Sequence, residues 1–275
     1  MKVFAMTKQR KLMFAGVIAV ALTLIAWTAI SPSVAEGVAE ASEAKVRLKA
    51  MTDYMGAQKI ISFDYDSNLE VVTKDQQKLS LLASGTVSLN RPDKIRTTRS
   101  GGFADTETVF DGTTLTVLGR NKNVYVQADA PGSIDHVVKE LHNKFDRPIP
   151  AADLFRSDAY EGLMAEVIDV KDLGSGVIAG VECDYFAFRT KELDLQIWIA
   201  QGAVPYPCRY VIATKGVTDG PQYSIQFRNW KTGDEVAAVD FGFKAPAGAR
   251  KISLDELKTM KNMGELPSNF IQGGQ

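Results

Sequence analysis

The chain has 275 residues, of which 45% are hydrophobic, 24% charged and 9% aromatic. This composition is typical of a folded globular protein, and it excludes wholesale disorder, a collagen helix and a small disulfide-dense scaffold. The 32 basic and 33 acidic side chains give a formal net charge of −1. Because the chain has no strongly basic character, nucleic acid is not expected as a partner.

The first 35 residues have the order of a secretory signal peptide. Four basic residues and no acidic residue accompany a continuous apolar run at 12–30, and Ser33-Val34-Ala35 then offers small residues for a signal peptidase. We expect cleavage after Ala35, export to the periplasm and a single mature domain at 36–275. The alternative is an uncleaved anchor, since the 19 apolar residues are enough to span a bilayer.

Removal of this segment makes the chain more acidic. The remaining 240 residues hold 28 basic and 33 acidic side chains, which gives a net charge of −5. Such a chain does not bind anionic lipid headgroups by charge alone. If the protein handles lipid, we therefore expect an apolar cavity to do it.

Hydrophobic periodicity predicts an initial helix followed by a long series of strands. The helix is expected at 42–55, where apolar residues recur at three- and four-residue steps and Gly56 provides a stop. The period then changes to two, with turn signals such as Gly101-Gly102 and Asp111-Gly112. Strands are predicted at 61–71, 79–89, 94–100, 103–110, 113–119 and 123–127.

The middle of the chain breaks the strand pattern. Ser133 can cap a helix with one apolar face, which Pro148 and Pro150 end, and a second helical patch is expected at 151–164. A last short helix near 253–261 opens with a capping box. The remaining predicted strands are 165–173, 181–189, 193–200, 206–215, 223–231 and 239–243.

The predicted fold is mainly β with an α lid. About ten or eleven short strands with little parallel βαβ signal favour a half-open, curved antiparallel β-barrel in one domain. The concave apolar face of such a sheet must be covered. The helices at about 131–164 are the expected lid.

Cys183 and Cys208 form an isolated pair, and an even count in an oxidising compartment predicts a disulfide. In a plain meander they lie on next-nearest strands, about 9–10 Å apart, whereas a bridge needs Cα atoms within about 7 Å. The bond therefore requires Pro205 and Pro207 to bend the chain. The alternative is two buried thiols.

The sequence offers little support for catalysis. No GxSxG, HExxH, P-loop or GxGxxG stands in a supporting context. His136 and His142 are six residues apart and point to different faces of a helix, which makes a poor metal pair. The acidic residues Asp153, Asp158 and Glu161 are explained by helix N-terminal stabilisation, with acid–base work as the alternative. We expect no enzyme, no cofactor and no metal.

Three stretches in order carry a resemblance to a known family. They are Gly85–Arg96 with its Arg-Pro corner, the hairpin Phe110–Val117 and the segment Phe241–Ala249. This order resembles the periplasmic lipoprotein carrier LolA and its relatives. The resemblance implies a half-open barrel with a helical lid and an apolar cavity for acyl chains.

The second half of the chain is similar to a large family of predicted periplasmic proteins that is labelled a domain of unknown function. That likeness rests on Gly180–Arg189, Gln196–Ile199 and Pro205–Ile212. Together with the stretches above, the resemblance covers about residues 42–252. Two departures from the carriers are the Cys pair and the sequence Ile95-Arg96-Thr97, which stands where the carriers have an aromatic residue after the corner.

In the carrier family, the arginine before the corner proline holds the lid by hydrogen bonds, and Arg91 is the matching position. The alternative for Arg91 is a surface arginine beside a β-corner. The candidate ligand-binding residues are Arg91 together with the apolar positions expected on the inner wall and the lid: Phe63, Tyr65, Leu69, Leu81, Val87, Leu115, Val117, Ile134, Val138, Leu141, Phe186, Phe188, Leu195, Ile197, Ile225 and Phe227.

We therefore expect a monomeric periplasmic protein that binds or carries a lipid-like or acylated apolar ligand, with envelope proteins as further candidate partners. The first alternative is a non-enzymatic structural or interaction module of the envelope with a filled core. This alternative stands because apolar residues on strands usually pack into a filled core. A hydrolase acting on lipid or glycan is a third hypothesis, for which no nucleophile arrangement is visible. A pocket of several hundred Å³ would distinguish a binding protein from a filled module.

Overall fold

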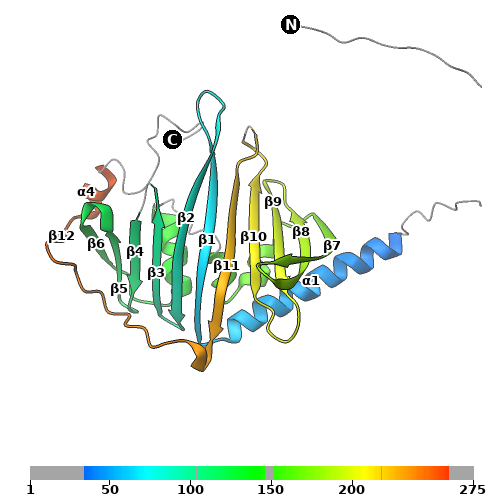
Figure 1. Ribbon diagram of the computed structural model, residues 1–275, viewed down its shortest axis with the longest axis horizontal. Coiled ribbons are helices and arrows are strands. Elements are labelled where there is room, and N and C mark those ends of the chain that lie inside the picture. Colours follow the sequence, from blue (N-terminus) through cyan, green and yellow to red (C-terminus); the bar gives the residue numbers. More distant parts are fainter. Residues whose placement is uncertain (1–33, 103–104, 146–151, 218, 260–275) are drawn as a thin grey trace, which may run out of the picture.

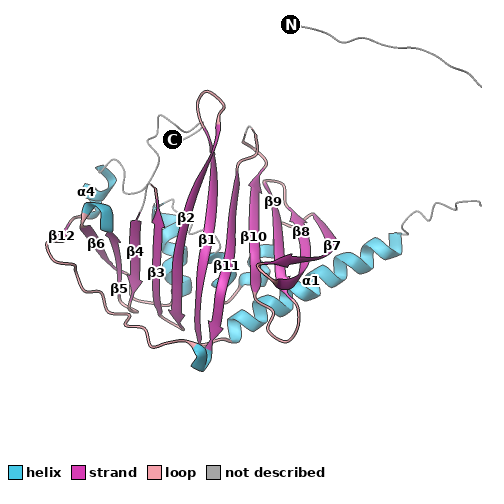
Figure 2. Ribbon diagram, viewed as in Figure 1, coloured by secondary structure: helices cyan, strands magenta, loops and turns pink. Residues whose placement is uncertain are grey.

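The computed structural model describes residues 34–102, 105–145, 152–217 and 219–259 (Figures 1 and 2). Its helices are α1 (Val34–Ala57), α2 (Ile134–Phe145), α3 (Ala159–Met164) and α4 (Leu254–Thr259), with short 3-10 turns η1 (Arg120–Lys122), η2 (Ala152–Phe155) and η3 (Gly233–Glu235). Its strands are β1 (Ile60–Val72), β2 (Lys78–Asn90), β3 (Lys94–Gly101), β4 (Asp105–Phe110), β5 (Thr114–Gly119), β6 (Val124–Asp129), β7 (Asp169–Ile178), β8 (Val181–Arg189), β9 (Leu193–Ala200), β10 (Pro207–Thr214), β11 (Gln222–Thr232) and β12 (Arg250–Lys251).

These strands make one curved sheet in the order β12-β6-β5-β4-β3-β2-β1-β11-β10-β9-β8-β7 (Figure 1). The pairing of β1 with β11 joins the two meanders β1–β6 and β7–β11 in the centre of the sheet. Neighbours are antiparallel except for β12, which runs parallel to β6. Because β12 and β7 lie at opposite ends of the order, the sheet is not closed. The predicted half-open barrel is confirmed.

Regular register explains the alternation seen in the sequence. β1 and β2 pair without interruption from Ile60 opposite Asn90 to Val72 opposite Lys78. Side chains of directly paired residues share a face, so the row from Phe63 to Val87 faces the core. The Asp111 carboxylate accepts the backbone N–H groups of Thr113 and Thr114 and shapes the tight turn before β5.

Helices cover the inner, concave face of the sheet. α1 buries Ala44, Leu48, Met51 and Met55 completely and lies along β7 in Figure 1. The lid segments contribute Ile134 from α2, Leu154 and Phe155 from η2 and partly buried residues from α3 to the same core cluster. Among the described residues, no helix has the length and apolar character needed to cross a membrane.

The helices differ from their predicted limits. The initial helix starts at Val34 rather than Ser42, and it runs to Ala57. The patch predicted at 151–164 is two short pieces, η2 and α3, and the strand predicted at 165–173 lies at Asp169–Ile178. The strand expected from 103 begins, within the described part, at Asp105.

The strand predicted at 239–243 is wrong. Residues 236–249 form no ladder with the sheet and instead run as an irregular strap along its outer face. Side chains hold the strap: Arg96 donates to the carbonyl of Asp240, and the Phe243 ring lies 5.1 Å from that of Tyr125. Alternating apolar residues that pack individually in this way look like a strand in the sequence.

Candidate ligand-binding face

The structure brings most of the predicted wall and lid residues into one core cluster on the inner face. Those buried in it are Phe63, Ile134, Phe186, Phe188, Leu195, Ile197, Ile225 and Phe227, and those partly buried against it are Tyr65, Val87 and Val138. The exposed fractions of the buried residues are between 0 and 5%. In the described residues the helices and the sheet therefore pack directly against each other here.

The other predicted residues lie apart from this cluster. Leu115 packs with Phe110 and Val137 in a smaller cluster, and Val117 lies against the group that holds α4. Leu69 is 40% exposed and its partner Leu81 is half-buried at the far end of the β1–β2 hairpin. The side chain of Leu141 is outside the described residues.

An aromatic stack joins the wall to the lid. The ring of Phe63 on β1 lies 5.3 Å from that of Phe155 on η2 and 5.4 Å from that of Trp230 on β11, nearly parallel to both. Tyr206 extends the stack, because its ring lies 5.3 Å from that of Trp230 and nearly parallel to it. Phe155 and Trp230 were not among the predicted site residues.

Trp230 was missed because the strand changes parity before it. β11 has an extra residue between its pairs with Asp64 and Ser62, and Asn229 has a φ of +52°. This bulge turns Trp230 to the same face as Phe227, although the two are three residues apart. An Asn at this place is a weak signal for a bulge, because Asn tolerates a left-handed backbone.

Polar contacts fasten the lid at the β2–β3 corner. The Arg91 guanidinium donates to the carbonyl of Phe155 at 2.8 Å, and the first N–H of α2, that of Ile134, donates to the carbonyl of Pro92 at 2.8 Å. Burial lowers the pKa of Arg91, and the negative charge of nearby Asp135 partly offsets this shift. Asp135 also accepts the Ser157 hydroxyl at 2.5 Å and so links α2 to the segment before α3.

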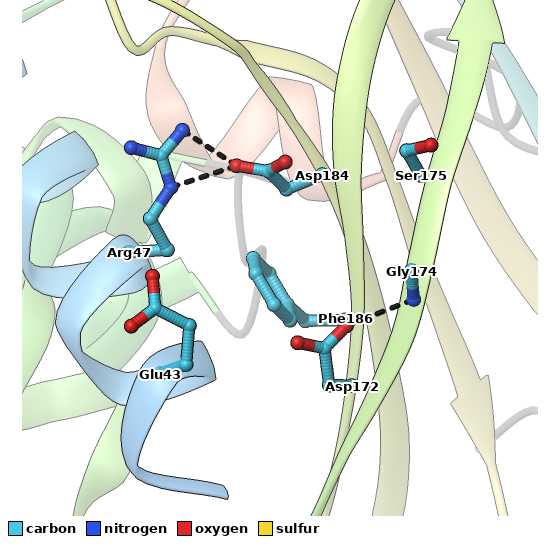
Figure 3. A pocket seen from close by; sticks show the side chains of 7 residues that line it. All are labelled: Glu43, Arg47, Asp172, Gly174, Ser175, Asp184 and Phe186. Atoms are coloured by element: carbon cyan, nitrogen blue, oxygen red, sulfur yellow. Dashed lines mark hydrogen bonds and ion pairs between the residues drawn. The ribbon is translucent and has the colours of Figure 1, made fainter. Parts of the chain in front are cut away.

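A cavity of about 270 Å³ lies between α1, β7 and β8, and it is polar (Figure 3). Arg47 and Asp184 form an ion pair across it, with 2.7 Å between Nε and Oδ2, and Gln201 donates to the other oxygen of Asp184. Glu43 points into the cavity from α1 beside Arg47. The remaining lining residues are Asp172, Gly174, Ser175 and Phe186. This chemistry differs from the apolar cavity that the resemblance implied.

Cys183 and Cys208 meet in a small buried cluster with Ala200. Both are free thiols, and their sulfur atoms are 2.6 Å apart, which is longer than the roughly 2.05 Å of a disulfide bond. Cys208 occupies a register shift between β9 and β10, directly after Pro207. The contact between the thiols raises the pKa of Cys208 and lowers that of Cys183.

The predicted acidic and histidine residues are dispersed. Asp158 is at the N-cap position of α3, yet its carboxylate pairs with Arg156 at 2.7 Å rather than with the helix N–H groups. His136 is exposed, and the His142 side chain is outside the described residues. Within the described ranges, no three His, Cys, Asp or Glu residues gather in a metal-binding cluster.

The protein is of the mainly β class, with a half-open sheet whose concave face is covered by helices. The family model "Predicted periplasmic protein (DUF2092)" matches residues 44–255. The chain belongs to this family, and the protein is periplasmic. No match was found among the curated proteins.

Solved structures with a similar arrangement come from several bacteria. An uncharacterized conserved protein of Thermus thermophilus is 11% identical, with a TM-score of 0.44, and the match covers 77% of this chain and 99% of that one. The lipoprotein LppX of Mycobacterium tuberculosis is 14% identical, with a TM-score of 0.38 and coverage of 72% and 99%. A LolA superfamily protein of Nitrosomonas europaea is 11% identical, with a TM-score of 0.33 and coverage of 70% and 94%.

Proposed function

We propose that this protein binds or carries a lipid-like, acylated ligand on the concave face of its sheet, beneath the lid formed by α2, η2 and α3. The observation that carries the proposal is the construction of the lid. A large apolar and aromatic face is covered by short helical pieces that are fastened at the corner by Arg91 and by the N–H of Ile134. Such a cover can move away while the sheet stays intact.

The burial of an acyl chain supplies enough free energy for this function. A chain of sixteen carbons gains on the order of 10 kcal/mol from burial of its CH₂ groups, before the costs of binding. The ligand then replaces the contacts that Phe155 and Ile134 make with the wall in the closed arrangement. No attraction between the ligand and the net charge of the chain is needed.

The test is binding of a fluorescent fatty-acid probe to matched variants. Leu195→Arg places a charge on the inner wall, where Leu195 is 4% exposed, whereas Leu82→Arg places the same charge at a position that is 69% exposed. We expect the inner variant to lose the probe and the exposed variant to keep it, with folding of both checked by circular dichroism. Equal binding by both folded variants would contradict a site on the inner wall.

A second candidate, an envelope module with a filled core, is favoured by the close packing of the inner residues. Their exposed fractions are between 0 and 5%, and the cavity beside them holds the charged side chains of Arg47 and Asp184. A module of this kind binds no acyl probe and co-purifies with no lipid. The same probe assay on the wild-type protein therefore separates the two candidates.

We also propose that Cys183 and Cys208 are oxidised to a disulfide in the periplasm. Their sulfur atoms are already in contact, and both side chains are buried beside Ala200, the last residue of β9. In the chain-entropy model, a loop of this length stabilises the fold by about 3.5 kcal/mol. Alkylation of the denatured protein without reductant, followed by mass analysis, is expected to modify neither residue; two alkylated thiols would overturn the proposal.

Export by a cleaved leader and a monomeric state complete the proposal. Residues 1–33 are outside the described part of the structure, so the order of basic, apolar and small residues is the support for cleavage after Ala35. Intact mass of the protein from the periplasm should place its N-terminus at Glu36. A mass that includes the apolar run would indicate an anchor, and light scattering gives the oligomeric state.

A further inference from the structure

One arginine lies on the inner face of the sheet, away from the lid corner. Cross-strand pairing places Tyr65 opposite both Phe227 and Gly85, and Gly85 in turn opposite Arg99 on β3. Paired residues share a face, and Phe227 belongs to the buried core. Arg99 therefore shares the concave face with the candidate ligand-binding residues.

A tyrosine reaches toward this arginine because the strand between them has a glycine. A Cβ atom at Gly85 would lie 2.7 Å from Cζ of Tyr65 and 2.0 Å from the Thr98 carbonyl oxygen. In its absence, the Tyr65 ring crosses β2 and its hydroxyl donates to the Thr98 carbonyl at 3.0 Å. The hydroxyl is thus held beside the backbone of Arg99.

A second tyrosine completes a polar group in this apolar surrounding. Tyr223 is paired with Leu69 on the same face, and its hydroxyl contacts the Ser67 hydroxyl. Burial raises the pKa values of Tyr65 and Tyr223, while the charge of Arg99 lowers both. Both phenols therefore stay neutral at physiological pH, and Arg99 is the charged member of the group.

The carboxylates of the neighbouring strands are turned away from Arg99. Asp66 and Glu107 are at outward-facing positions, where Arg228 pairs with Asp66 and both Arg96 and Arg120 pair with Glu107. Within the described ranges of the chain, Arg99 has no ion pair. A half-buried guanidinium without a counter-charge is unfavourable, so its place on this face calls for an anionic partner from outside the chain.

We propose that Arg99, assisted by the hydroxyl of Tyr223, binds the anionic head group of an amphiphile. The head group is a carboxylate or a phosphate, whose geometry suits the guanidinium fork. The apolar chain lies along β1 from Tyr65 toward Phe63, beneath the lid where Phe155 stacks on that ring. This inference rests on the proposed function and narrows its ligand class to anionic lipids.

The test compares amphiphiles that share one chain and differ in the head group. Dodecanoate, dodecyl phosphate and dodecanol are measured by displacement of the fluorescent probe from wild-type protein, Arg99→Gln and Arg228→Gln. Arg228 is the matched control, since it lies on the outer face in an ion pair with Asp66. We expect both anions to bind wild-type protein about tenfold or more tightly than the alcohol, as a charge-assisted hydrogen bond allows.

Arg99→Gln should abolish this preference without weakening dodecanol, and Arg228→Gln should leave the preference unchanged. Equal affinity of wild-type protein for the three compounds, or a preference that survives in Arg99→Gln, would overturn the head-group site while leaving lipid binding intact. Acetate and inorganic phosphate are tested alone. If they bind as tightly as the amphiphiles, the partner is a free anion and the amphiphile proposal is wrong. If wild-type protein binds neither the probe nor any of the three amphiphiles, the proposed function itself fails.

Discussion

On strands β1 to β4, the two faces of the sheet differ in how their charged side chains are paired. On the outer face, carboxylates and guanidinium groups are neighbours, as in the pair of Asp66 with Arg228 and the group of Glu107 with Arg96 and Arg120. On the same strands the inner face is built from apolar and aromatic side chains, with Arg99 as a cation that has no ion pair in the described residues. A face that neutralises its own charges is suited to stability and solvent, whereas one that leaves a charge open is suited to a ligand.

The largest expected difference between the faces is in apolar burial. Phe63→Ala removes a ring that is 2% exposed and stacks on both Phe155 and Trp230, so we expect a loss of about 4 kcal/mol in unfolding free energy. Leu82→Ala, at a position 69% exposed, should change it by less than about 0.5 kcal/mol. Urea denaturation measures both, and similar losses would show that the two faces do not differ as described.

Gly85 tests the close approach on the inner face. A Cβ at this position would meet the Thr98 carbonyl and the Tyr65 ring, so Gly85→Ala should destabilise the protein by about 3 kcal/mol. Gly216→Ala is the control, because no atom lies within 4 Å of its added Cβ. A Gly85→Ala variant as stable as the control in thermal unfolding would mean that the Tyr65 ring is free to leave its place.

Arg91 tests the attachment of the lid. Arg91→Leu removes the hydrogen bond to Phe155, which is worth about 2 kcal/mol for a charged donor. We expect faster hydrogen exchange in α2, η2 and α3 with little change in β1 or β2. Arg189→Leu, which breaks an exposed pair with Asp194, is the control; lid exchange at the wild-type rate in Arg91→Leu would reduce Arg91 to a surface residue.

Glu107 tests the outer face, where the expected effect is smallest. Burial raises the pKa of its carboxyl, but hydrogen bonds and charge from Arg120 and Arg96 outweigh burial and hold it below the ordinary value of 4.5. A lowered pKa stabilises the folded state above pH 4.5, and the contribution disappears as the pH falls through the folded pKa. Both arginines are partly exposed, so Glu107→Gln should cost about 1 kcal/mol at pH 7. The difference should shrink as the pH falls below 4.5, and a pH-independent difference would contradict this cause.

The sequence was sufficient to predict the parity of most strands. Alternation alone identified the inner positions of β1 and β2, and residues such as Phe63 and Val87 lie where it placed them. The Arg-Pro corner indicated the Arg91 position, and the observed hydrogen bond to Phe155 is of the kind that the resemblance implied. These features depend on near neighbours in the chain, which a periodic pattern records.

Features that depend on distant contacts were not predicted. The bulge at Asn229 turns Trp230 inward, and the strap at 236–249 has strand-like alternation without strand partners. Arg99 was not recognised as an inner residue, because its own strand is short and largely polar. Its face became clear only from the register with Gly85 and Tyr65.

The most direct test of the central claim is native mass spectrometry of the protein purified from its own periplasm, followed by lipid extraction. If the concave face holds an acylated ligand, the spectrum shows the chain with an added mass that extraction recovers as an acyl-containing lipid. Mild organic solvent should remove that mass and leave the fold intact. A single ligand-free mass, from a protein that also fails to bind the fluorescent fatty-acid probe, would contradict the account and leave a filled envelope module in its place.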